Sequence, residues 1–323
     1  MSTAIIQLLV GLVLLAAGGH AIVRGAISVA LLARISTAVV GLTVVAFGTS
    51  LPELAVSLRA AATGHAQISY ANVVGSNIFN IAAVLGLVAL VRPVTVSRSL
   101  RLQYPGMLVV MILCVVFAYG GHVTRLEGLF LVGGLVAFMG FTVYVVRTGR
   151  DLLDPEEAEE EVRSVGAVRG PPLRAWLLSL LLVVGGIGAL SWGADQLVAG
   201  AVTLARLAGM TERVIGLTVI AMGTSLPELA ATLAASRHGD PDIVMGNLLG
   251  SNIFNVLAIL GLTAAIFPVP VDPRAIALDN WMMLGTAAVI GPMMAARRKV
   301  GRIDGGILLL GFSVYIAVLL TIG

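Results

Sequence analysis

The sequence contains very few charged residues. Only 11% of its 323 residues are Asp, Glu, Lys or Arg, whereas a soluble globular domain carries about 25%. This composition excludes a disordered chain, because disorder requires high polarity. A net charge of +3 is too small for a surface that follows nucleic-acid phosphates, so we expect no nucleic-acid partner. The single cysteine, Cys114, excludes a disulfide scaffold.

Apolar residues take the place of the missing charge. They make up 58% of the chain, and the mean hydropathy is +1.02. The apolar runs are close to the length of about 20 residues that a helix needs to cross a lipid bilayer. We therefore predict an all-α polytopic membrane protein with ten transmembrane helices, near residues 4–33, 36–62, 68–91, 104–121, 126–147, 172–205, 211–236, 241–267, 281–296 and 303–322.

The chain contains an internal repeat. Residues 41–87 align without gaps on residues 216–262 at an offset of 175, and we count 28 identities over 47 positions. Each half then holds five helices, so the second half enters the membrane in the opposite orientation. Such inverted repeats are typical of secondary transporters that bind their substrate near the midplane. We predict a first half at 1–147, an acidic linker at 148–171 and a second half at 172–323.

Basic residues gather on one side of the predicted membrane. Fourteen of the 20 Lys and Arg residues lie in loops after odd-numbered helices, and five lie in the other loops. Because basic loops stay in the cytoplasm, we predict that both termini are outside and that the linker is cytoplasmic. The linker carries seven acidic residues, which we interpret as a solvated segment. A regulatory calcium patch is the alternative, although the run lacks the spaced ligands and the glycine of a calcium loop.

Three carboxylates lie deep in predicted helices: Glu53, Glu228 and Asp195. A charge in lipid costs about 2.5–3.5 kcal/mol on insertion scales, so such residues need a partner or a function. Glu53 and Glu228 occupy the same position of a repeated heptapeptide, GTSLPEL. The proline before each glutamate, Pro52 or Pro227, has no N–H and interrupts the helix. The break frees a backbone carbonyl, which is tolerated at membrane depth only where protein or a wet cavity satisfies it.

Hydroxyl and amide side chains share helix faces with the two glutamates or lie on the next helix. Helical spacing groups them as Thr49 and Ser50 with Glu53, Thr224 and Ser225 with Glu228, Ser76 with Asn80, and Ser251 with Asn255. An all-oxygen set with two negative charges suits a hard cation such as Ca²⁺ or Na⁺ and argues against copper, zinc or iron. The alternative is that the small and polar residues serve helix packing and interhelical hydrogen bonds.

The paired motifs GLTVVAFGTSLPE and GLTVIAMGTSLPE, each followed by GSNIFN, resemble the alpha repeats of the sodium/calcium exchanger family. The resemblance implies ten helices in two inverted halves, an ion site within one chain, and long first and sixth helices that slide across the core. It also implies a prokaryotic inner or plasma membrane location, transported Ca²⁺ and Na⁺, and no cofactor. The ligands that it implies are Glu53, Glu228, Thr49, Ser50, Thr224, Ser225, Ser76, Ser251, Asn80, Asn255 and the carbonyls of Ala46 and Ala221.

Two positions depart from the family pattern. Some members carry an acid where this chain has Asn255, so the core charge here is −2 when both glutamates are ionised. Similar members also carry an acid in the first helix, where this chain has His20. His20 is either a polar anchor near a helix end or a titratable group in the gate, since histidine changes charge near neutral pH.

We therefore predict a secondary antiporter that exchanges Na⁺ for Ca²⁺ by alternating access. A proton/calcium antiporter, in which both glutamates are protonated on the return step, is the alternative. A cation channel is a weaker alternative because the repeat builds its site within one chain. We predict no enzymatic activity, because Ser50 and Ser225 have no deep acid–base partners other than Glu53 and Glu228.

Overall fold

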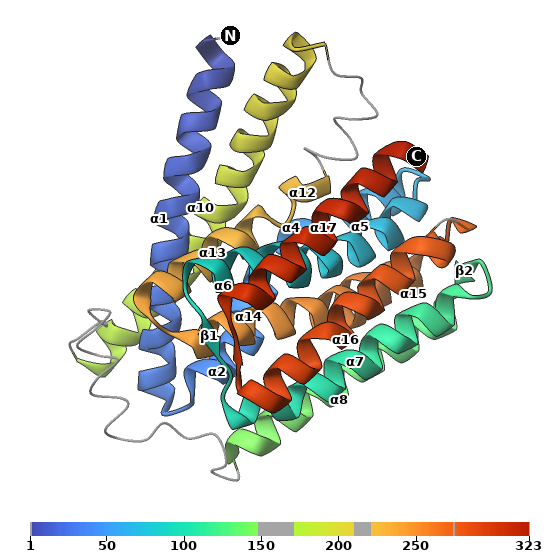
Figure 1. Ribbon diagram of the computed structural model, residues 1–323. Helices are drawn as coiled ribbons and strands as arrows, with labels where there is room; N and C mark the ends of the chain where they lie inside the picture. The colour runs from blue at the N-terminus through green and yellow to red at the C-terminus, as the bar shows by residue number, and fades with distance from the viewer. Residues whose placement is uncertain (1, 148–170, 210–220, 274, 323) are drawn as a thin grey trace.

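A computed structural model describes residues 2–147, 171–209, 221–273 and 275–322, and the chain in these ranges is almost entirely helical (Figure 1). In the first half the helices, including the π-helices labelled η, are α1 (Ser2–Ala33), α2 (Thr37–Val40), η1 (Gly41–Val45), α3 (Ala46–Thr49), α4 (Leu51–Ala62), α5 (Gln67–Ile78), η2 (Phe79–Leu85), α6 (Gly86–Val91), α7 (Arg98–Ala118) and α8 (Arg125–Arg147). The predicted linker at 148–171 lies outside the described residues, apart from its last residue, Pro171.

The described part of the second half follows a similar order of elements, with an additional π-helix, η5, before α16. Its helices are α10 (Pro172–Leu207), α12 (Ala221–Gly223), α13 (Leu226–His238), α14 (Pro241–Phe254), η4 (Asn255–Leu260), α15 (Gly261–Ile266), η5 (Ala275–Asp279), α16 (Asn280–Arg297) and α17 (Arg302–Ile322). The first five residues of the repeat at 216–262 lie outside the described part of the chain.

Two short antiparallel ladders join loops of the two halves. Strand β1 (Val94–Thr95) pairs with β4 (Lys299–Val300), and β2 (His122–Val123) pairs with β3 (Val269–Pro270). Each strand has only two residues, too few for a recognisable alternation of apolar and polar side chains, so residue patterns could not predict them. They fasten loops at helix ends and leave the fold class helical, as predicted.

Helices α1 and α10 form an antiparallel pair that projects beyond the other helices (Figure 1). They have 32 and 36 residues, which confirms that the first and sixth apolar runs are unusually long. Small residues let their backbones approach closely: a Cβ atom on Gly18 would lie 2.9 Å from the Gly186 carbonyl oxygen, and one on Gly186 would lie 2.8 Å from the Ile22 nitrogen. Close packing of this kind holds helices together in lipid.

Several described helices are long and apolar enough to cross a membrane. Seven meet both conditions, and the bent pair Thr37–Thr49 and Leu51–Ala62 makes an eighth. Of the two remaining predicted spans, 281–296 coincides with α16, whereas 211–236 begins outside the described residues. The seven are Ser2–Ala33, Gln67–Val91, Leu100–Ala118, Arg125–Tyr144, Leu173–Leu207, Pro241–Ile266 and Arg302–Thr321.

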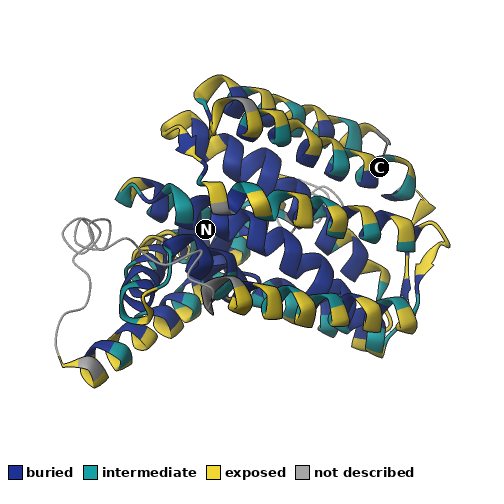
Figure 2. Ribbon diagram, turned by 90° about the horizontal axis from the view of Figure 1, so that it is seen from below, coloured by how far each residue is buried: buried dark blue, intermediate teal, exposed yellow. Residues whose placement is uncertain are grey.

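The distribution of polarity is the reverse of that in a soluble protein. Large apolar side chains such as Leu181, Phe130 and Leu310 are exposed, whereas Glu53 and Glu228 are buried. Exposed residues lie along the outer helices and buried residues lie in the interior of the bundle (Figure 2). Exposed apolar surface on this scale marks contact with lipid, and intramembrane charge faces the interior of a helix bundle. The chain is therefore an integral membrane protein.

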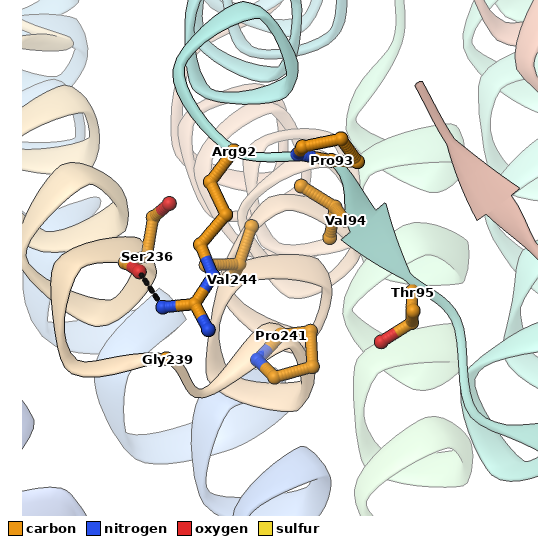
Figure 3. Close-up of a pocket in the computed structure, with 8 residues that line it drawn as sticks. All are labelled: Arg92, Pro93, Val94, Thr95, Ser236, Gly239, Pro241 and Val244. Carbon is orange, nitrogen blue, oxygen red and sulfur yellow. Dashed lines mark hydrogen bonds between the residues drawn. The ribbon is translucent and has the colours of Figure 1, made fainter. Parts of the chain in front are cut away.

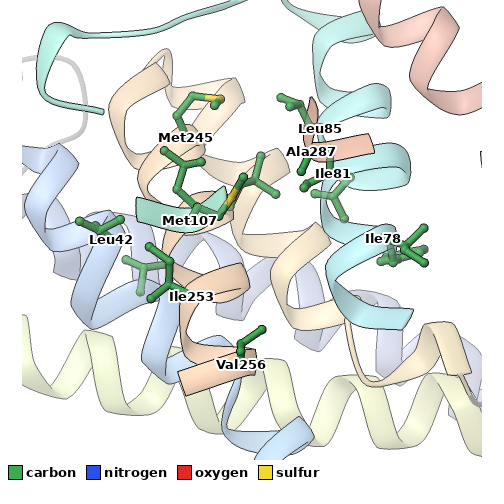
Figure 4. Close-up of a cluster of buried hydrophobic side chains, with 14 of the residues drawn as sticks. Leu42, Ile78, Ile81, Leu85, Met107, Met245, Ile253, Val256 and Ala287 are labelled. Carbon is green, nitrogen blue, oxygen red and sulfur yellow. The ribbon is translucent and has the colours of Figure 1, made fainter. Parts of the chain in front are cut away.

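The two helices that carry GSNIFN lie at the centre of the fold. Every residue of α14 from Ile243 to Phe254 is buried, and so is every residue of η2. Apolar side chains such as Ile78, Ile81, Met107 and Ile253 fill the space around them (Figure 4). This packing fixes the polar residues on α5, η2, α14 and η4 within a dense apolar surround.

One buried hydrogen bond ties α5 to α16 and leads to a prediction. The Tyr70 hydroxyl donates to Asn280 Oδ1 at 2.6 Å, and both side chains are buried. Tyr70→Phe leaves Asn280 without this partner, so we expect a loss of about 1–3 kcal/mol in unfolding free energy. Thermal unfolding in detergent measures it, with Tyr119→Phe on an exposed tyrosine as the control. Equal melting temperatures for the two variants would contradict the assignment.

Candidate ion-binding site

Each glutamate of the repeated heptapeptide follows a break in its helix. In the first half α3 ends at Thr49 and α4 begins at Leu51, and the helices around this break are bent by 41°. In the second half α12 ends at Gly223 and α13 begins at Leu226. Pro52 and Pro227 lie in the first turn of the new helix, where a missing N–H is tolerated. The predicted breaks are therefore confirmed.

Two hydrogen bonds link the halves directly at the carboxylates. Glu53 and Glu228 are each 1% exposed. The Ser225 hydroxyl donates to Glu53 Oε1 at 3.0 Å, and the Ser50 hydroxyl donates to Glu228 Oε1 at 3.0 Å. Each half thus supplies the hydroxyl that supports the carboxylate of the other half, and the arrangement repeats with the same distance.

A second repeated set of contacts flanks the carboxylates. The Thr49 hydroxyl donates to Asn247 Oδ1 at 3.3 Å, and the Thr224 hydroxyl donates to Asn72 Oδ1 at 3.4 Å. Asn72 Nδ2 in turn donates to Ser57 Oγ at 3.0 Å. The equivalent bond in the second half runs from Asn247 Nδ2 to Thr232 Oγ1 at the same distance. These two asparagines therefore connect helices, as the packing alternative expects.

Two buried amides that the sequence predicted as ligands lie on π-helical segments. Asn80 belongs to η2 and Asn255 begins η4, and both are fully or almost fully buried. Short π-helical segments within α-helices occur frequently at functional sites. The motif GSNIFN predicted a continuous helix, and no residue type in it signals the change of helix geometry.

Several buried oxygen atoms at the centre have no hydrogen-bond partner among the described residues. A buried oxygen without a partner costs about 1–3 kcal/mol, and more when it is charged. Nearly all such groups in proteins are satisfied, so a group of them requires an explanation. Carboxylate, amide and hydroxyl oxygens are ligands of hard cations, so a bound cation offers such an explanation. The atoms are Glu53 Oε2, Glu228 Oε2, Asn80 Oδ1, Asn255 Oδ1 and Ser251 Oγ.

The remaining predicted ligands differ in what surrounds them. Ser76 Oγ accepts a hydrogen bond from Ser225 Oγ at 3.1 Å, so it belongs to the same cluster. The Ala46 carbonyl accepts from the Ser50 backbone N–H at 3.1 Å and from Thr49 Oγ1 at 3.3 Å. Ala221 begins α12 directly after undescribed residues. The described contacts thus bring the hydroxyls and carboxylates together but assign no partner to the Ala221 carbonyl.

Other candidate residues lie away from this cluster. Asp195 is exposed on α10, unlike the two glutamates.

A pocket where the end of α6 meets the turn between α13 and α14 contains none of the predicted ligands (Figure 3). There Arg92 Nη1 donates to the Ser236 carbonyl at 3.3 Å and helps to hold α6 against α13.

The crossed serine–glutamate bonds lead to a matched pair of predictions. Hydrogen bonds to charged groups contribute about 1.5–3 kcal/mol, so Ser50→Ala and Ser225→Ala should each weaken cation binding about 10–100-fold. Because the two bonds are equivalent, the losses should be similar. Calcium titration of the purified protein measures them, and Ser179→Ala, which removes only a bond to the Ala175 carbonyl, is the control. Unchanged affinity in both site variants would contradict the role of the bonds.

Known proteins resemble this chain over almost its whole length. The family model described as sodium/calcium exchanger protein matches residues 3–144 and 178–321. The chain is 40% identical to the putative antiporter CaxA of Alkalimonas amylolytica over 98% of both chains. It is 30% identical to the sodium/calcium exchanger MaX1 of Methanosarcina acetivorans, again over 98% of both. A solved structure of the sodium-calcium exchanger NCX_Mj superposes with a TM-score of 0.81 at 29% identity over 97% of both chains. The chain belongs to the sodium/calcium exchanger protein family.

Proposed function

We propose that this protein is a secondary active antiporter that exchanges Na⁺ for Ca²⁺ across the membrane. Its family, its relatives and its match to a sodium-calcium exchanger structure support this function. The observation that carries the proposal is the set of unpartnered buried oxygens, two of which belong to glutamates that lie on equivalent, proline-broken helices. Oxygen atoms of carboxylates, amides and hydroxyls are the ligands that Ca²⁺ and Na⁺ prefer.

Charge balance explains why the two ions exchange rather than move together. Glu53 and Glu228, when ionised, give the core a charge of −2, which one Ca²⁺ or two Na⁺ neutralise. Both ions compete for the same oxygens, so occupancy by one excludes the other. An unloaded core leaves two carboxylates repelling each other in a low-dielectric interior, where charge repulsion is strong. Loading therefore favours the closed state through which the site changes sides.

The architecture supports alternating access within one chain. The site is built from α3, α4, α5 and η2 of the first half and α12, α13, α14 and η4 of the second half. Ten helices in two inverted halves place such a site near the midplane. The projecting pair α1 and α10 slides across this core, with both termini outside and the linker in the cytoplasm. The packing of small residues between α1 and α10 suits a pair that moves as one body.

Ion flux into proteoliposomes tests the proposal. Purified protein is reconstituted with Na⁺ inside, and uptake of radioactive Ca²⁺ is followed after dilution into Na⁺-free buffer at equal pH on both sides. We expect uptake that stops when the Na⁺ gradient is removed. Ca²⁺ uptake that does not depend on Na⁺ and is driven by a pH gradient would establish the proton/calcium alternative and contradict the proposal. Unitary currents in a planar bilayer would indicate a channel instead.

A further inference from the structure

Two histidines from distant parts of the sequence meet at the contact between α1 and α13. His20 Nδ1 lies 2.8 Å from His238 Nε2, and the ring centroids are 4.8 Å apart. His20 is exposed and His238 is half-buried. His238 is the last residue of α13, where the chain turns into α14, and we expect ions to reach the pair from this turn. Neither residue takes part in the cation cluster at Glu53 and Glu228.

The helices that carry these histidines are held close together. A Cβ atom on Gly19, next to His20, would lie 2.8 Å from the Ala230 carbonyl oxygen and 3.2 Å from the Ala234 Cβ. The backbone of α1 thus rests directly on α13 one turn before His238. The two rings therefore face each other across a close helix–helix contact, and both belong to helices.

We propose that His20 and His238 form a binding site for a transition-metal dication such as Zn²⁺, and that the bound metal clamps α1 to α13. Imidazole nitrogen is a preferred ligand of zinc. Tetrahedral geometry with Zn–N distances of about 2.0–2.1 Å places two ligating nitrogens about 3.3 Å apart. The two rings need to separate by only about 0.5 Å, which side-chain rotation provides at an exposed site.

The protonation of the pair is compatible with metal binding. At 2.8 Å two imidazoles share one hydrogen bond, in which one ring donates and the other accepts. When the donor ring moves its proton to its other nitrogen, both facing nitrogens present lone pairs. A metal can then replace the shared proton without either ring becoming charged, and neutral imidazole is the form that binds metal.

The surroundings set the expected strength of the site. Among the described residues no three His, Cys, Asp or Glu side chains are grouped to hold a metal, so water completes the coordination. Arg24 lies one turn after His20, and Arg237 precedes His238. These positive charges oppose a dication, and we expect binding in the micromolar range rather than the tight binding of a structural zinc site.

The clamp has a functional consequence that rests on the proposed antiport. If α1 slides across the core during exchange, a metal that joins α1 to α13 stops the slide. Zn²⁺ should therefore inhibit exchange without occupying the Ca²⁺ ligands. The site thus provides regulation by transition metals at one face of the protein.

Metal binding by the purified protein tests the site independently of transport. Zn²⁺ is titrated calorimetrically into the wild type and into His20→Gln, His238→Gln, His65→Gln and His122→Gln. Loss of a ligand should weaken binding at least as much as the roughly 10–100-fold loss that follows removal of a group supporting a ligand. The last two variants, which alter histidines outside the pair, should bind like the wild type. No saturable binding to the wild type, or equal binding by His20→Gln, would overturn the proposal.

Transport then tests the clamp. Saturating Zn²⁺ on both sides of the proteoliposome membrane should inhibit Na⁺-driven Ca²⁺ uptake by the wild type and leave uptake by His20→Gln largely unchanged. If Zn²⁺ binds through His20 and His238 but inhibits the wild type and His20→Gln equally, or inhibits neither of them, the clamp is overturned. Absence of Na⁺-driven uptake in metal-free buffer would instead contradict the proposed antiport, and calorimetry would still decide the metal site.

Discussion

Glu53→Gln and Glu228→Gln should each reduce Ca²⁺ transport to the background of empty liposomes. The substitution keeps the shape of the side chain and removes one of the two buried charges that face the cation. Removing one partner of a buried charge pair costs about 3–5 kcal/mol, which corresponds to at least about a 100-fold loss of affinity. Because no other described carboxylate lies in the cluster, nothing nearby can replace the missing charge.

Folding must be separated from binding in this experiment. Both variants should elute as the wild type does in size-exclusion chromatography and should melt at similar or higher temperature, because repulsion between the carboxylates is relieved. Glu127→Gln is the matched control, since Glu127 accepts hydrogen bonds from Thr124 at the start of α8 and lies outside the cluster. Wild-type transport by Glu53→Gln or Glu228→Gln would refute the assignment of the site.

Gly186→Leu should strongly destabilise the protein and impair transport, because it forces α1 and α10 apart. A side chain at Gly186 would meet the Ile22 backbone nitrogen and the Gly18 carbonyl oxygen, neither of which can rotate away. Overpacking typically lowers the free energy of unfolding by about 1–3 kcal/mol. We expect a loss at the upper end of this range because the neighbours at Gly186 are backbone atoms. Thermal unfolding of the purified protein measures the loss, and Na⁺-driven uptake measures the effect on the moving pair.

The neighbouring glycine gives a matched control. Gly185 lies on the same helix but is exposed, and no described atom lies within 4 Å of a Cβ added there. Leucine is the better helix former, so Gly185→Leu should melt at or above the wild-type temperature. Similar melting temperatures for Gly185→Leu and Gly186→Leu would show that the close contact between α1 and α10 has no energetic role.

Much of the fold could be predicted because lipid imposes strict rules on sequence. Runs of apolar residues located α1, α7, α8, α10 and α17 near their observed positions, since a spanning helix must be apolar over its full length. The repeated prolines located the breaks before Glu53 and Glu228, because proline cannot continue the hydrogen-bond ladder of a helix. The repeat itself showed which residues of the two halves are equivalent.

Contacts between helices could not be predicted from spacing. Helical periodicity placed Ser50 on the same face as Glu53, but in the structure the Ser50 hydroxyl donates a hydrogen bond to Glu228 of the other half. Crossed bonds depend on how the halves pack, which local sequence does not encode. The same limit applies to His20: the sequence identified it as unusual, but its partner His238 lies 218 positions away.

Residue patterns also could not predict local backbone geometry. The π-helical segments at Asn80 and Asn255 arise where the chain accommodates an extra residue in one turn, and no residue type in them marks this change. The exposure of Asp195 is another case: its depth in an apolar run predicted a buried charge, but it lies on the outer surface of α10. Depth along a helix and burial within the bundle are different quantities, and only the structure separates them.

Equilibrium Ca²⁺ binding in the presence of Na⁺ tests the central claim most directly. Purified protein in detergent is titrated with Ca²⁺ by calorimetry at increasing Na⁺, with Li⁺ or K⁺ keeping the ionic strength constant. We predict one Ca²⁺ per chain, displaced by Na⁺ with a dependence steeper than first order because more than one Na⁺ replaces each Ca²⁺. We predict no binding by the Glu53→Gln, Glu228→Gln double variant. Ca²⁺ binding that is insensitive to Na⁺, or that persists in the double variant, would contradict a shared site at the two glutamates.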